Sequence, residues 1–386
     1  MFIALDQEQA GLQAELRSYY AQMITPDVRA QLDAEETIGP VRRRLVEQLG
    51  ADGWIAMGWP EEFGGQGKSA IHQFIFFDES FRVGSPAPML TINTVGPTIM
   101  AFGTPEQKAH FLPNIAAGRF HFCIGYSEPD AGTDLFSLTT RAERDGDEYV
   151  INGQKTWTSQ SQGADYIWLA ARTNQDPNIK KQRGISIFAV PMATPGITLE
   201  TLNLLSSHNI TSTYFDNVRV PVSALVGEEN EGFRLITSQL NRERISLVSS
   251  GLVEQCLEET IEHARQSGQI DRPWVRRNLA QIDARLEMLR LINWKVAWSV
   301  SQNALDVAES SAVKVYGTEF YLEAFRLMMQ IRGLDSTAVN PAESHGASRL
   351  EALYRGMTIL TFGGGTNEMQ RDLITQFGLG FPRADR

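Results

Sequence analysis

The stretch between residues 126 and 159 decides the fold, through the runs Tyr126-Ser127-Glu128-Pro129-Asp130-Ala131-Gly132-Thr133-Asp134 and Ile151-Asn152-Gly153-Gln154-Lys155-Thr156-Trp157-Thr158-Ser159. The first run is rich in turn residues, and its small Ala131 and Gly132 allow the backbone to approach a flat ligand closely. In the second run, Asn152-Gly153 between β-prone residues predicts a hairpin with a type I′ turn. A tryptophan with hydroxyl neighbours at a strand end suits one face of a large heteroaromatic ring. The two runs therefore predict one half of a site for a flat aromatic cofactor.

The two runs, in this order and with this separation, resemble the acyl-CoA dehydrogenase family. Further blocks match the family in the expected order: Trp59-Pro60-Glu61-Glu62-Phe63-Gly64-Gly65, Phe102-Gly103-Thr104-Pro105-Glu106-Gln107-Lys108 and Gly365-Thr366-Asn367-Glu368-Met369-Gln370-Arg371. One block alone is a weak signal, whereas all of them in register along nearly the whole chain are a strong one. The resemblance implies FAD as cofactor, an acyl-CoA thioester as substrate and an electron-transfer flavoprotein as electron acceptor.

The resemblance also implies which residues hold the flavin. We expect the cofactor-binding residues to be Tyr126, Ser127, Gly132, Thr133, Trp157, Thr158, Ser159, Thr366 and Glu368. Among them, Trp157 is expected to pack against the ring system.

The composition is that of a soluble globular protein, and it excludes several classes of function. The 386 residues are enough for two or three domains, and 35 Lys plus Arg against 46 Asp plus Glu give a net charge of -11. This acidic balance argues against nucleic-acid binding, which needs a basic face. Two cysteines and six scattered histidines form no metal-binding motif. The N-terminus lacks a presequence pattern and no run has membrane-spanning apolar length, so we expect a cytoplasmic protein.

Residues 1–118 are expected to form an N-terminal helical domain. Asp6 is a plausible N-cap for a helix over Gln7–Gln22. Thr104-Pro105-Glu106-Gln107 is a capping box with proline at the first helical position, which predicts a helix from Pro105 toward Ile115.

Residues 119–230 are strand-like, and residues 231–386 return to long helical periodicity. The predicted strands are Asp147 to Ile151, Tyr166 to Ala171, Ile185 to Val190 and Thr213 to Val220. Glycine and proline between such runs are typical of an antiparallel barrel or sandwich. The expected fold is therefore α+β multidomain, with an N-terminal helical domain, a middle antiparallel β-barrel domain and a C-terminal four-helix bundle, as in the acyl-CoA dehydrogenase family.

Glu243 lies on the helix expected to begin near Gly232. Apolar residues recur there at the spacing of one buried face: Phe233, Ile236, Leu240, Leu247, Val248, Gly251 and Leu252. Glu243 projects from this stripe, and burying a carboxylate costs free energy unless it is paired or neutralised. Burial also raises a carboxyl pKa toward the range useful for a general base. From the residues alone, a salt bridge to a neighbouring helix explains Glu243 equally well.

The family resemblance favours Glu243 as the catalytic base. Most members carry the catalytic glutamate two residues before the threonine of the C-terminal Gly-Thr block, a position occupied here by Gly364. A minority place it on the helix after the β-domain, immediately before an arginine, as in Glu243-Arg244. The resemblance also assigns Gly364 a catalytic role, because its backbone N–H would bind the thioester carbonyl. Arg244 and Asn241 are expected to contact the substrate.

One part of the family pattern is missing from the chain. Family dimers complete each FAD site with an Arg-x-x-Phe-Gly and a Gln-x-x-Gly-Gly segment of the neighbouring subunit. Here these regions read Arg265-Gln266-Ser267-Gly268 and Gln330-Ile331-Arg332-Gly333-Leu334, without the phenylalanine and the second glycine. A leucine side chain would block a backbone approach that glycine permits. The pattern resembles the heterotetrameric dehydrogenases of bacterial sterol side-chain degradation and predicts a non-identical partner subunit, with a homo-oligomer as the alternative.

The leading hypothesis is thus an acyl-CoA dehydrogenase acting on a bulky or branched acyl group and passing electrons to an electron-transfer flavoprotein. A related flavin oxidase or monooxygenase is an alternative, because oxygen reactivity has no sequence signature. A flavin-stabilising subunit whose partner performs the chemistry is another, and Glu243 in the apolar stripe argues against it.

Overall fold

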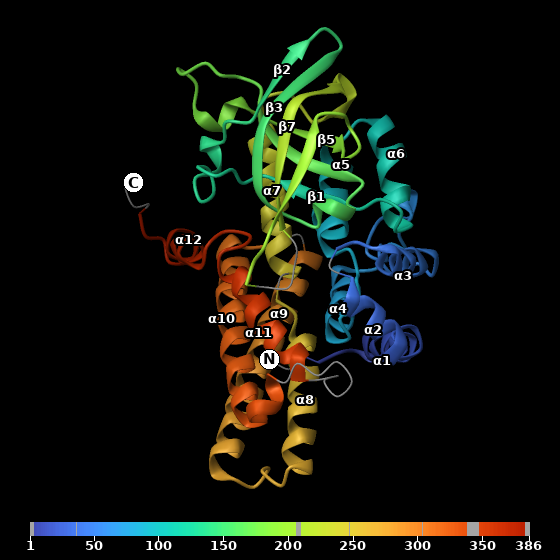
Figure 1. Cartoon of the computed structure of the whole chain (residues 1–386), viewed down its shortest axis with the longest axis vertical. Helices are drawn as coiled ribbons and strands as arrows, with labels where there is room; N and C mark the ends of the chain where they lie inside the picture. The colour runs from blue at the N-terminus through green and yellow to red at the C-terminus, as the bar shows by residue number, and fades with distance from the viewer. Residues whose placement is uncertain are drawn as a thin grey trace.

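The computed structural model describes residues 4–35, 37–205, 210–246, 248–302, 304–337 and 347–382, with their side chains except those of residues 240–246, 347 and 348. Helices, a sheet and again helices follow one another along the chain. Figure 1 shows the sheet at one end of the long axis, the C-terminal helices reaching the other end, and the N-terminal helices along the side. The expected helical, β, helical architecture is confirmed.

The N-terminal part consists of helices whose starts are set by capping residues. Asp6 accepts a hydrogen bond from the Gln9 backbone N–H, and Thr104 and Gln107 form a reciprocal capping box. Both helices predicted from these caps are confirmed. The elements are α1 (Gln7–Met23), α2 (Pro26–Ala34), α3 (Pro40–Ala51), α4 (Ala70–Arg82), the π-helical turn η2 (Thr91–Val95), α5 (Gly96–Phe102) and α6 (Pro105–Ala116).

The middle part is one sheet of mostly antiparallel strands. They are β1 (Phe122–Gly125), β2 (Arg141–Asp145), β3 (Glu148–Ser159), β4 (Tyr166–Arg172), β5 (Ile185–Pro191), β6 (Ile197–Leu202), β7 (Ile210–Pro221) and β8 (Leu225–Val226). Neighbours follow the order β6-β7-β3-β2-β4-β5-β8, and β1 pairs with β4 in parallel. The strands predicted from the sequence coincide with parts of β3, β4, β5 and β7.

The hairpin predicted at Asn152-Gly153 is wrong. β3 continues through both residues because it pairs with β2 along one edge and with β7 along the other. Its pairing with β7 shifts register between Ile151 and Gly153, where the glycine has a φ of 148°. The chain instead reverses between β2 and β3, at Gly146, whose φ is 64°. Pairing along both edges has overridden the local turn preference of the Asn-Gly pair.

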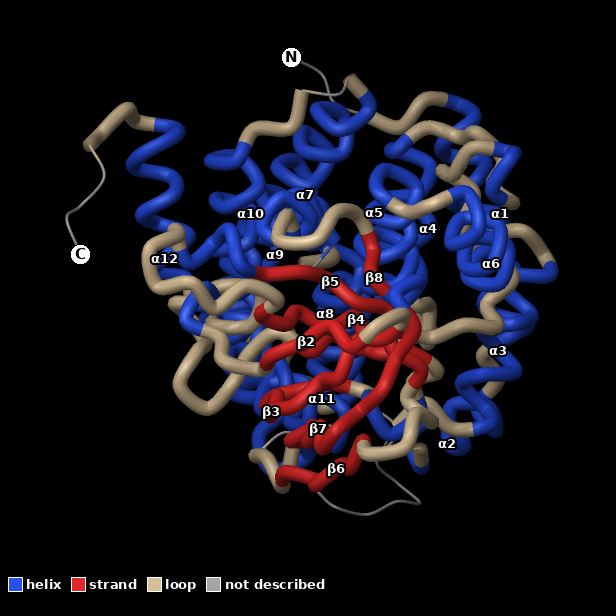
Figure 2. Tube along the Cα trace, turned by 90° about the horizontal axis from the view of Figure 1, so that it is seen from above, coloured by secondary structure: helices blue, strands red, loops and turns tan. Residues whose placement is uncertain are grey.

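The C-terminal part contains a four-helix bundle, as predicted. Its helices are α7 (Gly232–Ser246), α8 (Ser250–Gln266), α9 (Pro273–Ser301), α10 (Val307–Arg332), α11 (Ala347–Gly356) and α12 (Asn367–Leu373). One apolar cluster joins α8, α9, α10 and α11, through side chains such as Leu252, Leu286, Phe325 and Leu350. Figure 2, seen from above, shows the sheet with these helices behind it and α12 at the periphery.

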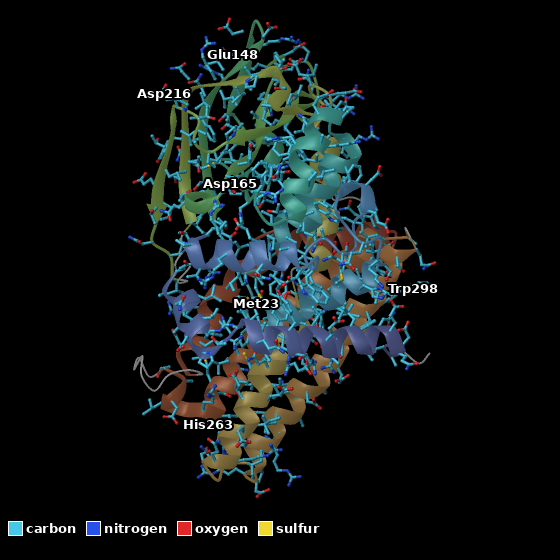
Figure 3. The ribbon with its side chains drawn as sticks, turned by 90° about the vertical axis from the view of Figure 1, so that its right-hand side faces the viewer. Met23, Glu148, Asp165, Asp216, His263 and Trp298 are labelled. Carbon is cyan, nitrogen blue, oxygen red and sulfur yellow. The ribbon has the colours of Figure 1, made fainter. Side chains whose placement is uncertain are left out.

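A second apolar core lies between the sheet and the N-terminal helices. It contains Phe76 from α4, Trp168 from β4 and Ile236 from α7, so the first C-terminal helix enters the junction. At the surface of this junction the Arg43 guanidinium of α3 lies 3.0 Å from the carboxylate of Asp165, which Figure 3 labels in the lower part of the sheet region. Among the described residues, no helix combines the length and the apolarity needed to cross a bilayer.

Candidate active site

The loop after β1 is fixed to β3 by a buried ion pair. Lys155 Nζ lies 2.7 Å from Glu128 Oε1 and donates to the Tyr126 carbonyl at 3.0 Å, and both charged side chains are buried. Glu128 also accepts hydrogen bonds from the backbone N–H groups of Thr139 and Thr140, at 2.6 and 2.9 Å. The first of the two runs quoted above is thereby held in a single position against the strand that carries the second.

Each member of this pair has a displaced pKa. Burial works against ionisation of Glu128, but the charge and hydrogen bond of Lys155, with the hydrogen bonds from Thr140 and Thr139, lower the pKa of Glu128 to about 2. Burial lowers the pKa of Lys155 to about 8, while Glu128 opposes that change. Both groups are therefore charged at neutral pH, and the pair is an ionic clamp.

The end of β3 carries a strained tryptophan. Trp157 has a φ of 61°, and the pairing of β3 with β7 is irregular between Lys155 and Thr158. A positive φ is a real outlier for a bulky residue, and such strain is concentrated at ligand sites. The indole is 58% exposed, so it is available as a flat apolar face.

Thr158, the next residue, has an orphaned hydroxyl. Its side chain is fully buried, and its Oγ1 has no hydrogen-bond partner among the residues that the structure describes. A buried polar group normally finds a partner, so this hydroxyl is an exception within the protein interior. The strained and exposed indole of Trp157 fits an isoalloxazine ring because it offers a flat apolar face, whereas the buried Thr158 hydroxyl has no surface open to a ligand.

The remaining predicted flavin residues of the sheet lie around this turn. Ser127 is half-buried, and its carbonyl accepts from the Thr156 backbone N–H at 2.9 Å, which places the two runs side by side. Gly132, Thr133 and Ser159 are exposed. A Cβ placed on Gly132 would meet nothing within 4 Å, so that part of the loop is open.

The C-terminal glycine turn is fixed by a second buried lysine. Gly364 and Gly365 have φ values of 68° and 95°, which glycine tolerates and other residues rarely adopt. Lys314 of α10 is fully buried and donates to the Gly365 carbonyl at 2.7 Å and to Asn367 Oδ1 at 2.8 Å. Thr366 then caps α12 by accepting from the Met369 backbone N–H.

The turn thus presents its backbone in one conformation next to a helix N-terminus. Glu368, predicted to bind the cofactor, is exposed in the first turn of α12. Sequence reasoning missed Glu128, Lys155 and Lys314, whose burial is not apparent from their residue types.

Helix α7 carries the predicted base, but the stripe argued from the sequence is wrong. Asn241, Glu243 and Arg244 belong to α7, while their side chains lie outside the described part of the structure. The helix ends at Ser246 and α8 begins at Ser250, so Val248, Gly251 and Leu252 are not on its face. The side chains of Leu240 and Leu247 lie outside the described part of the structure.

The two described apolar residues of α7 named in that stripe have different environments. Ile236 is buried, as predicted, whereas Phe233 is 40% exposed and packs its ring against Phe136 at 5.1 Å between centroids. The end of α7 at Ser246 and the contact of Phe233 with Phe136 explain why a single 3.6-residue period misrepresents this region.

A cavity of about 460 Å³ lies between the N-terminal helices, the residues just before α8, and α9. Its aromatic wall is formed by Trp59, Phe74, Phe77 and Phe81, and its aliphatic wall by Val248, Ala297, Val300 and Leu305. Val248 and Ser249 follow directly after the end of α7. A hollow of this size and apolar character is typical of small-molecule sites. The residues that line it are far apart in the sequence, so no sequence motif predicted the cavity.

Asp78 lies at the same cavity and joins its two walls. Its carboxylate accepts hydrogen bonds from Ser249 Oγ at 2.6 Å and from the Gly251 backbone N–H at 3.1 Å. A side chain of α4 therefore satisfies the first turn of α8, where free N–H groups favour an anion.

The regions with missing family residues lie on the surface of the bundle. Arg265, in the last turn of α8, is exposed and lies 3.7 Å from Glu262. Leu334, after the end of α10, is 88% exposed. Beside it is a hollow of about 280 Å³ lined by Arg326, Met329, Gln330, Ser336 and Tyr354.

Comparisons with known proteins agree with this architecture. Residues 6–119, 123–218 and 230–379 match, respectively, the N-terminal, middle and C-terminal domains of acyl-CoA dehydrogenases. The chain is 49% identical to the acyl-CoA dehydrogenase FadE26 of Mycobacterium tuberculosis over the full length of both. The chain therefore belongs to the acyl-CoA dehydrogenase family, and it is an enzyme of that class.

Solved structures give the same result in three dimensions. The chain is 50% identical to a chain of the ChsE4-ChsE5 complex from Mycobacterium tuberculosis, with a TM-score of 0.92 and full coverage of both chains. It is 44% identical to a chain of the Tcur3481-Tcur3483 steroid ACAD, with a TM-score of 0.93 and the same coverage.

Proposed function

We propose that this chain dehydrogenates an acyl-CoA thioester between Cα and Cβ, with Glu243 as the base. The course of α7 carries the proposal. The helix ends at Ser246, shortly before Val248 and Ser249 line the 460 Å³ cavity. Position 243 thus lies in the last turn of a helix that leads to the cavity, while the alternative family position is a glycine with a φ of 68° at Gly364.

The other steps of the proposed reaction are assigned to further groups of the chain. Glu243 would take the α-proton, and the backbone N–H of Gly364 would donate to the thioester oxygen as charge develops there. FAD, when bound, supplies the acceptor for the β-hydride. Trp157, Ser127 and the loop around Gly132 would hold its ring, because they provide a flat face, a hydroxyl and open backbone. The apolar cavity walls would keep water from the reacting carbons.

We infer a bulky acyl group, with Asn241 and Arg244 contacting the ester. The cavity of about 460 Å³ is lined by aromatic and aliphatic side chains. Gly364, moreover, adds no side chain to the proposed site. A chain 44% identical to this one belongs to a steroid ACAD, which supports a sterol side-chain-like substrate.

We infer, further, a non-identical acyl-CoA dehydrogenase-like partner and an electron-transfer flavoprotein as acceptor. The exposed regions at Arg265 and Leu334 lack the phenylalanine and the second glycine of the family's ADP-binding pattern, and similar chains occur in the two-component complexes named above. The assembly would then hold fewer than one FAD per chain, because the site completed by Leu334 and Arg265 would be poor.

The test is anaerobic stopped-flow reduction of the flavin, using the chain co-expressed with its genomic neighbour and a panel of acyl-CoA esters. Glu243→Gln should lower the reduction rate by about 10²-fold or more, the lower end of general-base contributions, while FAD content and ester binding stay near native. Near-native reduction in this variant would refute the base. Rapid reoxidation of the reduced flavin in air would favour an oxidase over a dehydrogenase.

A further inference from the structure

Three buried side chains form a continuous series of hydrogen bonds, called the relay below, from the sheet to α7. Trp168 Nε1 of β4 donates to the Tyr126 hydroxyl at 3.1 Å, and that hydroxyl donates to Gln239 Oε1 of α7. Trp168 and Gln239 are fully buried, and Tyr126 nearly so. The hydrogen bonds join β4 and the start of the flavin loop, at Tyr126, to the helix that carries Glu243.

Hydrogen-bond counting fixes the direction of the relay. The indole N–H can only donate, so the Tyr126 hydroxyl accepts from Trp168 and directs its own proton to Gln239. The glutamine must therefore present its oxygen to the tyrosine. Its Nε2 has no partner among the described residues, so the Tyr126 bond is the described polar contact that holds this amide.

The position of Gln239 gives this contact a consequence. Residue 243 follows residue 239 by one helical turn, and residues at this spacing lie next to each other on a helix. Tyr126 directly precedes Ser127, whose carbonyl joins the flavin loop to β3. A shift of the Tyr126–Gln239 contact would therefore move the turn of the proposed base relative to the loop of the proposed flavin site.

We infer that Tyr126 and Gln239 are positioning residues for α-proton abstraction. Their hydrogen bond sets the position of the last turns of α7 relative to the flavin loop. This rests on the proposed function, because it assumes the base at position 243. It also gives the Tyr126 side chain a role distinct from contact with the cofactor, since its hydroxyl is used by Trp168 and Gln239.

The experiment measures flavin reduction in the complete complex for Tyr126→Phe, Gln239→Met and the double variant. Because an ångström of misplacement can cost about 10²-fold, we expect each single variant to be slowed about 10-fold at saturating ester, with little change in KM. The double variant should be no slower than the singles, since both changes break one contact. The α-deuterium isotope effect on reduction should increase, because proton abstraction is the step that is impaired.

Tyr20→Phe is the matched control. The Tyr20 hydroxyl makes an equally buried hydrogen bond with Ser80 Oγ at 2.6 Å, between α1 and α4. We expect its loss to leave the reduction rate and the isotope effect unchanged. Reduction within twofold of wild type in both single variants, an unchanged isotope effect, or additive losses in the double variant would overturn the inference. Failure of the proposed function is seen separately, as no ester reducing the wild-type flavin or as native rates in Glu243→Gln.

Discussion

Lys155 in the sheet and Lys314 in the bundle are both fully buried, and each fixes the backbone of one half of the site. They differ in their acceptors. Lys155 faces the carboxylate of Glu128 at 2.7 Å, whereas Lys314 donates to the uncharged oxygens of Gly365 and Asn367. Removing one member of a buried ion pair leaves an uncompensated charge, and removing a donor from neutral oxygens does not. The sheet half should therefore be the more sensitive to loss of its lysine.

Lys155→Met is expected to have the largest effect. Leaving Glu128 buried without its cation should lower the free energy of unfolding by about 3–5 kcal/mol. Denaturant unfolding monitored by fluorescence measures this loss. The double variant Lys155→Met/Glu128→Gln should recover part of it, and equal losses in the single and the double variant would contradict the ionic clamp.

The same clamp should appear in the pH dependence of stability. The pKa of Glu128 falls from an ordinary value of 4.5 to about 2, so its contribution is complete above about pH 4.5 and is lost as pH falls toward 2. A displacement of this size corresponds to about 3 kcal/mol. Glu128→Gln should flatten the acid limb of a stability–pH curve. Part of that limb should survive, because Asp165 also has a pKa of about 2.

Lys314→Met should cost less. Loss of the hydrogen bonds from this charged donor to the Gly365 and Asn367 oxygens is worth about 1.5–3 kcal/mol. The change should be local, visible as faster hydrogen exchange in α12. A global loss exceeding that of Lys155→Met would reverse the comparison between the two halves.

The smallest expected effect is a partial rescue in the helical half. In Glu243→Ala, adding Gly364→Glu should restore some flavin reduction, because the family uses both positions for its base. The φ of 68° at Gly364 strains a residue with a side chain, so recovery should stay far below wild type. A folded, flavin-containing double variant without any gain over Glu243→Ala would count against the shared geometry.

These comparisons also show what the sequence could reveal. The caps at Asp6 and Thr104 predicted their helices correctly, because capping is decided by residues within one turn. The hairpin predicted at Asn152-Gly153 was wrong because that prediction, too, used only local residues. Pairing of this segment with β2 and β7 opposes its local turn preference, and that pairing depends on residues far along the chain.

The site was predicted unevenly. Family motifs pointed to the loop at Ser127 and the turn at Gly364, but neither the Lys155–Glu128 clamp nor the strain at Trp157 has a local signature. Lys155 stands in β3 at alternate spacing from the apolar Tyr149 and Ile151, and this spacing is a signal that could have suggested a buried lysine with a partner. The cavity was out of reach, because its walls come from helices separated by more than half of the chain.

Asp78 has a consequence for engineering. It belongs to α4, borders the cavity, and satisfies Ser249 and Gly251 at the start of α8. A chimera that exchanges the N-terminal helices of two relatives to alter acyl preference would exchange this carboxylate as well. Such grafts should succeed when donor and recipient both keep the aspartate and the serine, and should lose the first turn of α8 when they do not. The part of α4 that lines the cavity is thus inherited together with the cap of a helix in another domain.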